Sequence, residues 1–179
     1  MKSRFTHVVF LHGKEELPDG MVAQLEGILK SAYPDVKFFR PYIPNVPSDE
    51  AYKCLAQFMP ALQPNSLLVG VGRGGLLAAR LQKSFPALHF HVIAINAPTS
   101  DGSLSTGSFY PDRVAFFSSR YAPIANRCGW RSVSPLAFDL DWMKSGKNHF
   151  HALCYLISGY MQGNDMADTV AHLFPTPIA

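Results

Sequence analysis

A glycine-rich turn near the middle of the chain offers the clearest chemistry in the sequence. The apolar run 66–71 is followed by Gly72, Arg73 and Gly74, and leucine and alanine come next. This succession predicts a strand, a tight turn and a helix. The first backbone amides of a helix have no partner inside it and can bind a carboxylate or phosphate group. The turn is therefore a candidate site for a small anion.

Arg73 allows two interpretations. The positive end of the helix dipole disfavours a cation at this position by about 0.3–1 kcal/mol unless an anion or acid lies nearby. A bound anion is one such partner. The alternative, which we favour, is that Arg73 points to solvent or pairs with Asp101 or Asp141, an arrangement that contributes little to stability.

The histidines and cysteines do not predict a metal site. His89 and His91 alternate along a predicted strand and share a face, but no third ligand accompanies them. The three cysteines are widely spaced and include no Cys-x-x-Cys pair, so neither a disulfide framework nor a zinc site is indicated. We interpret Cys128 and Cys154 as buried apolar side chains. We expect no metal and no cofactor.

Predicted strands and helices alternate along the chain. The expected strands are 7–11, 36–40, 66–71, 89–95, 113–118 and 133–140, and the expected helices are 21–32, 48–59, 73–84, 124–127, 150–160 and 166–173. This alternation predicts an α/β protein with a three-layer, doubly wound and mostly parallel sheet of about six strands. Ligands bind at the carboxyl ends of the strands in such sheets, and the glycine turn follows the third strand.

The composition is that of one folded domain, residues 1–179. Its hydrophobic fraction is 47% and its net charge is +3, too small and too scattered for nucleic-acid binding. We find no stretch of roughly 20 apolar residues that could cross a membrane, and the first apolar run is too short for a signal peptide. With the widely spaced cysteines, these features predict a cytoplasmic protein.

Four sequence blocks, taken in order, resemble those of a compact single-domain α/β-hydrolase of the esterase-like kind. The resemblance covers nearly the whole chain, without a cap domain and without the two leading strands of larger members. The blocks are Leu11-His12-Gly13, Gly70 to Gly75, Ser118 to Ile124 and Gly146 to His149. The first and second blocks imply an oxyanion hole formed by the backbone amides of Lys14 and Arg73, beside His12, Gly13 and Gly74.

The chain departs from this family at two of the three catalytic positions. The nucleophile elbow of such hydrolases is written Gly-x-Ser-x-Gly, but Gly72 stands at the serine position and Tyr121 at the acid position. Only His149, the base of the family's triad, matches, and it is interpreted as vestigial. Glycine also relieves the strain of about 1–3 kcal/mol that a nucleophile in the elbow stores.

The leading hypothesis is a catalytically degenerate serine hydrolase that binds a small, anionic ligand or a protein partner at the former active site. The alternative is an active esterase or thioesterase that uses a displaced nucleophile, or a water held by His149. Asp101, Asp141 or the hydroxyl of Tyr121 could then orient His149. A displaced nucleophile could come from the loop after the fourth strand, although ordinary loop polarity explains its serines better. These are Ser100, Ser103, Ser105 and Ser108.

Overall fold

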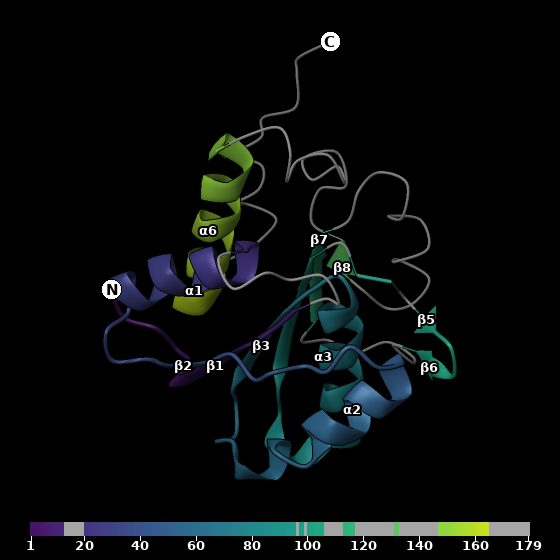
Figure 1. The fold of residues 1–179 in the computed structure, drawn as a ribbon. Coiled ribbons are helices and arrows are strands. Elements are labelled where there is room, and N and C mark those ends of the chain that lie inside the picture. The colour runs from purple at the N-terminus through teal and green to yellow at the C-terminus, as the bar shows by residue number, and fades with distance from the viewer. Residues whose placement is uncertain are drawn as a thin grey trace.

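The computed structural model describes residues 1–12, 20–95, 97–98, 100–105, 113–116, 131–132 and 147–164. Within these ranges the chain forms a three-layer α/β fold, with one parallel sheet between two pairs of helices (Figure 1). The strands of the sheet are β1 (His7–Leu11), β2 (Lys37–Phe39), β3 (Leu67–Val71), β4 (His91–Ile95), β7 (Arg113–Phe116) and β8 (Arg131–Ser132). The α-helices are α1 (Met21–Ala32), α2 (Ser48–Ala56), α3 (Arg73–Ser84) and α6 (Lys147–Gln162).

The strand order of the sheet, β2-β1-β3-β4-β7-β8, fixes where a ligand could bind. The chain passes from β1 outward to β2 and then returns to β3 on the other side of β1, and all neighbouring strands are parallel. The sheet is therefore doubly wound, as predicted. Its order reverses between β1 and β3, and the crevice at the carboxyl ends of these two strands is the expected ligand site of such a sheet.

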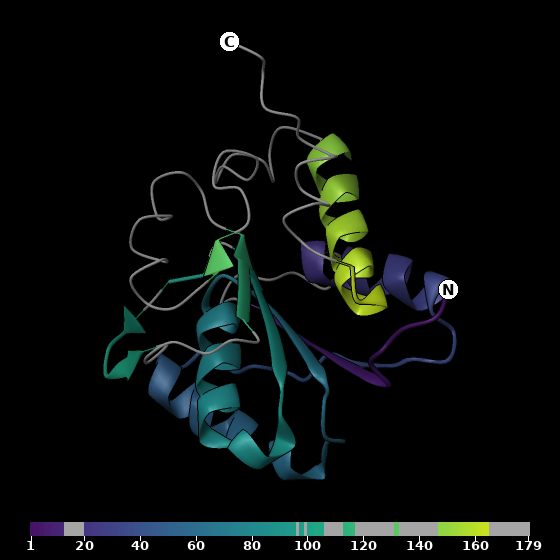
Figure 2. The same ribbon diagram turned by 180° about the vertical axis from the view of Figure 1, so that it is seen from behind.

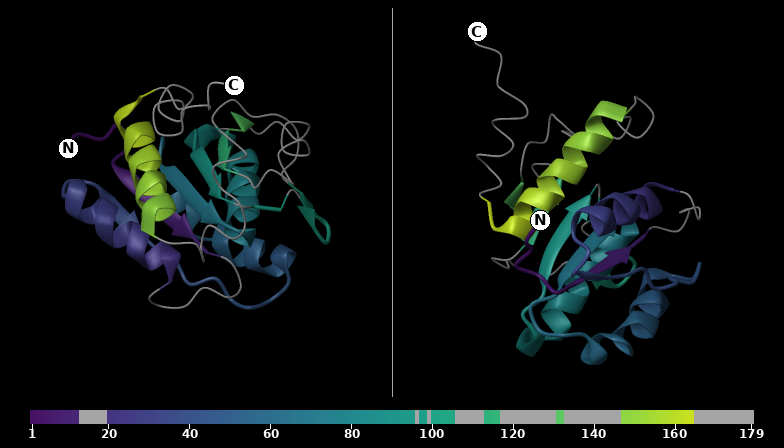
Figure 3. Two further views of the ribbon diagram at one scale, coloured as in Figure 1. Left: turned by 90° about the horizontal axis from the view of Figure 1, so that it is seen from above. Right: turned by 90° about the vertical axis from the view of Figure 1, so that its left-hand side faces the viewer.

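Two hydrophobic cores lie on opposite faces of the sheet. The alternation of side chains along a strand sends Val8 and Phe10 to one face and Val9 and Leu11 to the other. The first core is completed by α1 and α6, and the second by α2 and α3. Figures 2 and 3 show these helix pairs on either side of the sheet. Burial on both faces explains why the strands are continuous apolar runs.

Most element boundaries agree with the predicted ones, and the exceptions have local causes. β4 begins at His91 instead of residue 89, because 86–88 form a 3-10 turn and His89 adopts a left-handed conformation with φ 48°. His89 and His91 therefore do not share a strand face, and the pairing expected from the sequence is wrong. β8 precedes the expected strand 133–140, which lies outside the described residues, as do the expected helices 124–127 and 166–173.

One antiparallel hairpin was not expected. Residues 100–105, predicted as loop, contain β5 (Ser100–Asp101) and β6 (Leu104–Ser105). Gly102 and Ser103 form its two-residue turn; Gly102 has φ 61°, and glycine at the first turn position is typical of tight hairpins. Leu104 anchors the hairpin in the core under α2 and α3, with 6% of its surface exposed.

Cys154 and the apolar helices bear on two expectations that were drawn from the composition. Cys154 is buried, and burial raises the pKa of its thiol to about 11, so it is protonated near neutral pH and suits the role of an apolar side chain. Cys128 lies outside the described residues. No helix in the described part of the chain is long and apolar enough to cross a membrane.

Candidate functional site

The glycine turn lies at the carboxyl end of β3, where the strand order reverses. Gly72 is the N-cap of α3, with φ 57° and ψ −129°, a conformation that L-residues rarely adopt. Its amide N–H donates to the Ile95 carbonyl at the end of β4 (2.9 Å), and its own carbonyl accepts from the Gly75 amide (3.0 Å). The chain therefore reverses within one residue, as a nucleophile elbow requires.

The glycines on either side of Gly72 are required by close backbone packing. A Cβ at Gly74 would lie 2.1 Å from the Leu11 carbonyl oxygen, and a Cβ at Gly70 would lie 2.3 Å from the Gly74 carbonyl oxygen. The ends of β1 and β3 and the start of α3 thus touch through their backbones. A Cβ at Gly72 would have no atom of the described residues within 4 Å. The position that corresponds to the serine of a nucleophile elbow is therefore open on the side that the structure describes.

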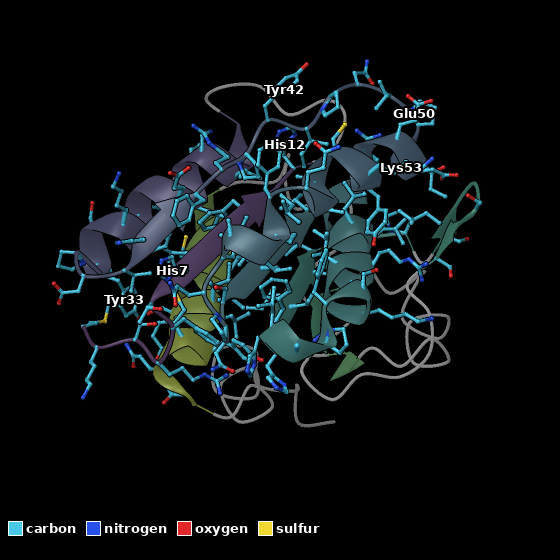
Figure 4. The ribbon with its side chains drawn as sticks, turned by 90° about the horizontal axis from the view of Figure 1, so that it is seen from below. His7, His12, Tyr33, Tyr42, Glu50 and Lys53 are labelled. Carbon is cyan, nitrogen blue, oxygen red and sulfur yellow. The ribbon has the colours of Figure 1, made fainter. Side chains whose placement is uncertain are left out.

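The end of β1 brings the first residue of the expected oxyanion loop to the elbow. His12 follows Leu11 directly, and its amide nitrogen would lie 3.0 Å from a Cβ at Gly74. Figure 4 labels His12 among the side chains of the structure. Gly13 and Lys14, which the resemblance adds to this loop, lie outside the described residues.

Arg73 is buried, which corrects the expectation that it points to solvent. Only 7% of its surface is exposed, and its guanidinium donates Nη1 to the Val46 carbonyl and Nη2 to the Pro44 carbonyl (2.9 Å). Burial lowers the pKa of the guanidinium, and attraction to Asp101 partly offsets this. Between the described residues Arg73 and Asp101 there is no ion pair, because the guanidinium bonds to backbone carbonyls instead. Asp141 lies outside the described residues.

One nitrogen of this buried guanidinium has no partner in the described part of the chain. The Nε of Arg73 makes no hydrogen bond there. A buried donor without a partner costs roughly 1–3 kcal/mol, and more when it belongs to a charged group. The start of α3 therefore combines a helix N-terminus with an incompletely satisfied buried cation.

Asp101 is held by α2. Its Oδ2 accepts a hydrogen bond from the Ser48 hydroxyl, and Ser48, the first residue of α2, is 2% exposed. The neighbouring Asp49 accepts from the Ser103 hydroxyl. These bonds tie the hairpin to the start of α2. The burial of Ser48 could not be predicted from the sequence, because its partner Asp101 lies 53 residues away in the hairpin.

The structure describes only some of the remaining predicted site residues. His149 lies in the first turn of α6, which begins three residues before the expected helix, but its side chain is outside the described part. Tyr121 and Ser108 also lie outside the described residues, while Ser100 and Ser105 belong to the hairpin. Among the described residues, no group of three His, Cys, Asp or Glu side chains could hold a metal ion.

Six parallel strands in this order, helices on both faces and a glycine turn after β3 fit an α/β-hydrolase-like fold. No protein-family model matches the chain, and no curated protein matches its sequence.

Three solved structures are similar to the chain in fold. One is an α/β hydrolase enzyme from the metagenome of lagoon sediments at Mar Chica, Morocco (TM-score 0.42, 20% identity, covering 55% of this chain and 47% of that one). Another is a probable hydrolytic enzyme from Pseudomonas aeruginosa PAO1 (TM-score 0.40, 15% identity, covering 55% and 34%). The third is an N-formylmaleamic acid deformylase from Pseudomonas putida S16 (TM-score 0.41, 13% identity, covering 70% and 49%). The chain matches less than half the length of each of these proteins.

Proposed function

We propose that this protein is a catalytically degenerate serine hydrolase that binds a small anionic ligand at its former active site. The observation that supports the proposal best is Gly72, which keeps the backbone turn of a nucleophile elbow and leaves the nucleophile position open. Triad chemistry requires a hydroxyl or thiol activated by histidine, and glycine has neither. A protein that only binds a ligand needs the backbone geometry of the elbow but not a nucleophile.

The charge at the start of α3 favours an anion over a neutral ligand. The amides of its first turn point their hydrogens out of the helix, and the dipole adds partial positive charge there. The Arg73 side chain is buried and donates to the Val46 and Pro44 carbonyls, and the helix has no acidic residue in its first turn. A carboxylate bound here would accept hydrogen bonds from the amides and reduce the electrostatic cost of the buried guanidinium.

The proposal predicts saturable binding of a simple carboxylate. In a 15N-resolved NMR titration with sodium acetate, we expect the amide resonances of Arg73 and Gly74 to shift and reach a plateau. The same concentrations of sodium chloride should leave them in place, since a screening effect would act on charged surfaces throughout the chain. Shifts that never saturate, or that chloride reproduces, would refute an anion site at the elbow.

The proposal also predicts no ester hydrolysis by the protein. We expect the purified protein to cleave short-chain aryl esters and thioesters no faster than its His149→Ala variant. Activity that disappears in His149→Ala would instead support the alternative, an active hydrolase with a nucleophile outside the elbow. The serines of the 100–108 segment would then be replaced one at a time to find it.

We further propose a cytoplasmic location and expect neither nucleic acid nor a membrane among the partners. The weak net charge of +3 and the wide spacing of the three cysteines support these expectations. The second occupant that we propose for the elbow is a protein partner.

A further inference from the structure

An open groove lies between α1 and α6, on the face of the sheet opposite to α3. It has a volume of about 450 Å³ and is lined by both helices together with Met1 and Asn164. Its buried lining includes Leu29 of α1 and Cys154 of α6. Figure 3 shows the two helices side by side on their face of the sheet. The groove is therefore separate from the elbow at the start of α3.

Exposed apolar side chains gather around this groove. Six large hydrophobic side chains are exposed in the described part of the chain, and three of them line the groove. They are Met1, Ile28 and Tyr155, with 67%, 40% and 55% of their surfaces exposed. Contiguous apolar patches on a protein surface mark sites of interaction, whereas single exposed apolar residues do not. The groove is a candidate interface for this reason.

Hydrogen bonds between the two helices fix the walls of the groove. The hydroxyl of Tyr33, the residue after α1, donates to the Ser158 carbonyl on α6 (3.1 Å) and accepts from the Gln162 side-chain nitrogen (3.0 Å). The amino group of Met1 donates to the Ala32 carbonyl at the end of α1 (3.2 Å). A partner therefore meets a preformed surface, so binding costs little reorganisation.

The lining of the groove carries no charged side chain. None of the ten described residues that line it is Asp, Glu, Lys or Arg, although these types make up 16% of the chain. A two-fold interface brings the same patch of two copies together, so a charge near the axis would face a like charge. An uncharged patch avoids this repulsion. Its charge pattern thus suits a second copy of this chain and gives no attraction for an anionic surface.

The shape of this surface also complements itself. Tyr155 extends from α6 at the rim of the groove, with more than half of its surface exposed. In a dimer with two-fold symmetry, each copy can place this ring in the groove of the other, which forms two equivalent contacts. Tyrosine and methionine are enriched in protein interfaces, and charged residues are depleted at their centres. The groove has both properties.

We infer that the groove between α1 and α6 is the interface of a symmetric homodimer, in which Tyr155 of each copy fills the groove of the other. This inference does not rest on the proposed anion site. The groove belongs to the face covered by α1 and α6, while α3 packs on the opposite face. Both copies of the elbow would stay accessible in such a dimer.

The test is sedimentation velocity over a range of protein concentrations. We expect the wild type to form a dimer and no larger species, because a two-fold contact closes on itself. Tyr155→Glu and Ile28→Glu should each raise the dissociation constant of the dimer at least about tenfold, since each places a charge in an uncharged interface. Both side chains are largely exposed in the monomer, so neither substitution should disturb folding, and thermal unfolding checks this.

Phe58→Glu is the matched control. Phe58 is 58% exposed, close to the 55% of Tyr155, but it follows α2, which covers the other face of the sheet. The control should dimerise as the wild type does. A dimer that Tyr155→Glu leaves intact, or that Phe58→Glu weakens as much, would form through another surface and overturn the inference.

A wild type that stays monomeric at every concentration would also overturn the inference. The groove would then be left to an occupant from the same chain, such as residues 165–179, which follow Asn164. Species that keep growing with concentration would exclude the two-fold arrangement. None of these results decides whether acetate binds at Arg73 and Gly74, so the inference and the proposed function can fail separately.

Discussion

Replacing Gly74 by alanine is expected to lower the free energy of unfolding by about 3 kcal/mol or more, the upper end of the range for overpacking. The new Cβ would lie 2.1 Å from the carbonyl oxygen of Leu11 and 2.5 Å from its carbonyl carbon. Both atoms belong to the backbone of β1, so the conflict cannot be removed by turning a side chain. Either α3 must move away from β1, or the end of β1 must leave its place in the sheet.

The measurement is chemical unfolding of Gly74→Ala beside Gly27→Ala. Gly27 lies within α1, and among the residues that the structure describes no atom would lie within 4 Å of a Cβ there. Because alanine is the better helix former, Gly27→Ala should raise the free energy of unfolding by up to about 1 kcal/mol. Similar stabilities of the two variants would show that the contact between β1 and α3 is looser than the structure indicates.

The elements around the elbow could be predicted because their signals are local. β1 and β3 are continuous apolar runs, and α3 begins where glycine gives way to leucine and alanine. The small residues at Gly70 and Gly74 were expected from the motif, and the close backbone contacts give the reason for them. Each of these features depends on residues adjacent in the chain or on a known supersecondary motif.

The surroundings of Arg73 could not be predicted, because its partners are distant in sequence and belong to the backbone. The carbonyls of Pro44 and Val46 lie 29 and 27 residues away, and a carbonyl has no residue type that a sequence pattern could single out. The same holds for the bond between Ser48 and Asp101, 53 residues apart, which forms only when the hairpin packs against α2. From its charge alone, Arg73 was expected to point to solvent or to pair with a carboxylate.

Gly72 adopts its positive φ without strain because it has no side chain, and adding one should lower the free energy of unfolding. Gly72→Ser is expected to lower the free energy of unfolding by about 1–3 kcal/mol, the cost of holding an L-residue in a strained conformation. Since φ is 57° and a Cβ would meet no atom of the described part of the chain within 4 Å, backbone strain and not crowding is the cause.

Gly72→Ala separates this strain from the chemistry of the hydroxyl. Both variants should be destabilised equally in urea unfolding, because both acquire a Cβ at the same backbone angles. Equal stability of the wild type and both variants would contradict the strained geometry of the elbow. The proposed function predicts that neither variant hydrolyses esters, because the resemblance puts Tyr121 at the acid position, and a tyrosine cannot supply the carboxylate that orients and stabilises a catalytic histidine. Turnover by Gly72→Ser alone would contradict this prediction and would mean that a carboxylate elsewhere in the protein orients a histidine toward the new serine.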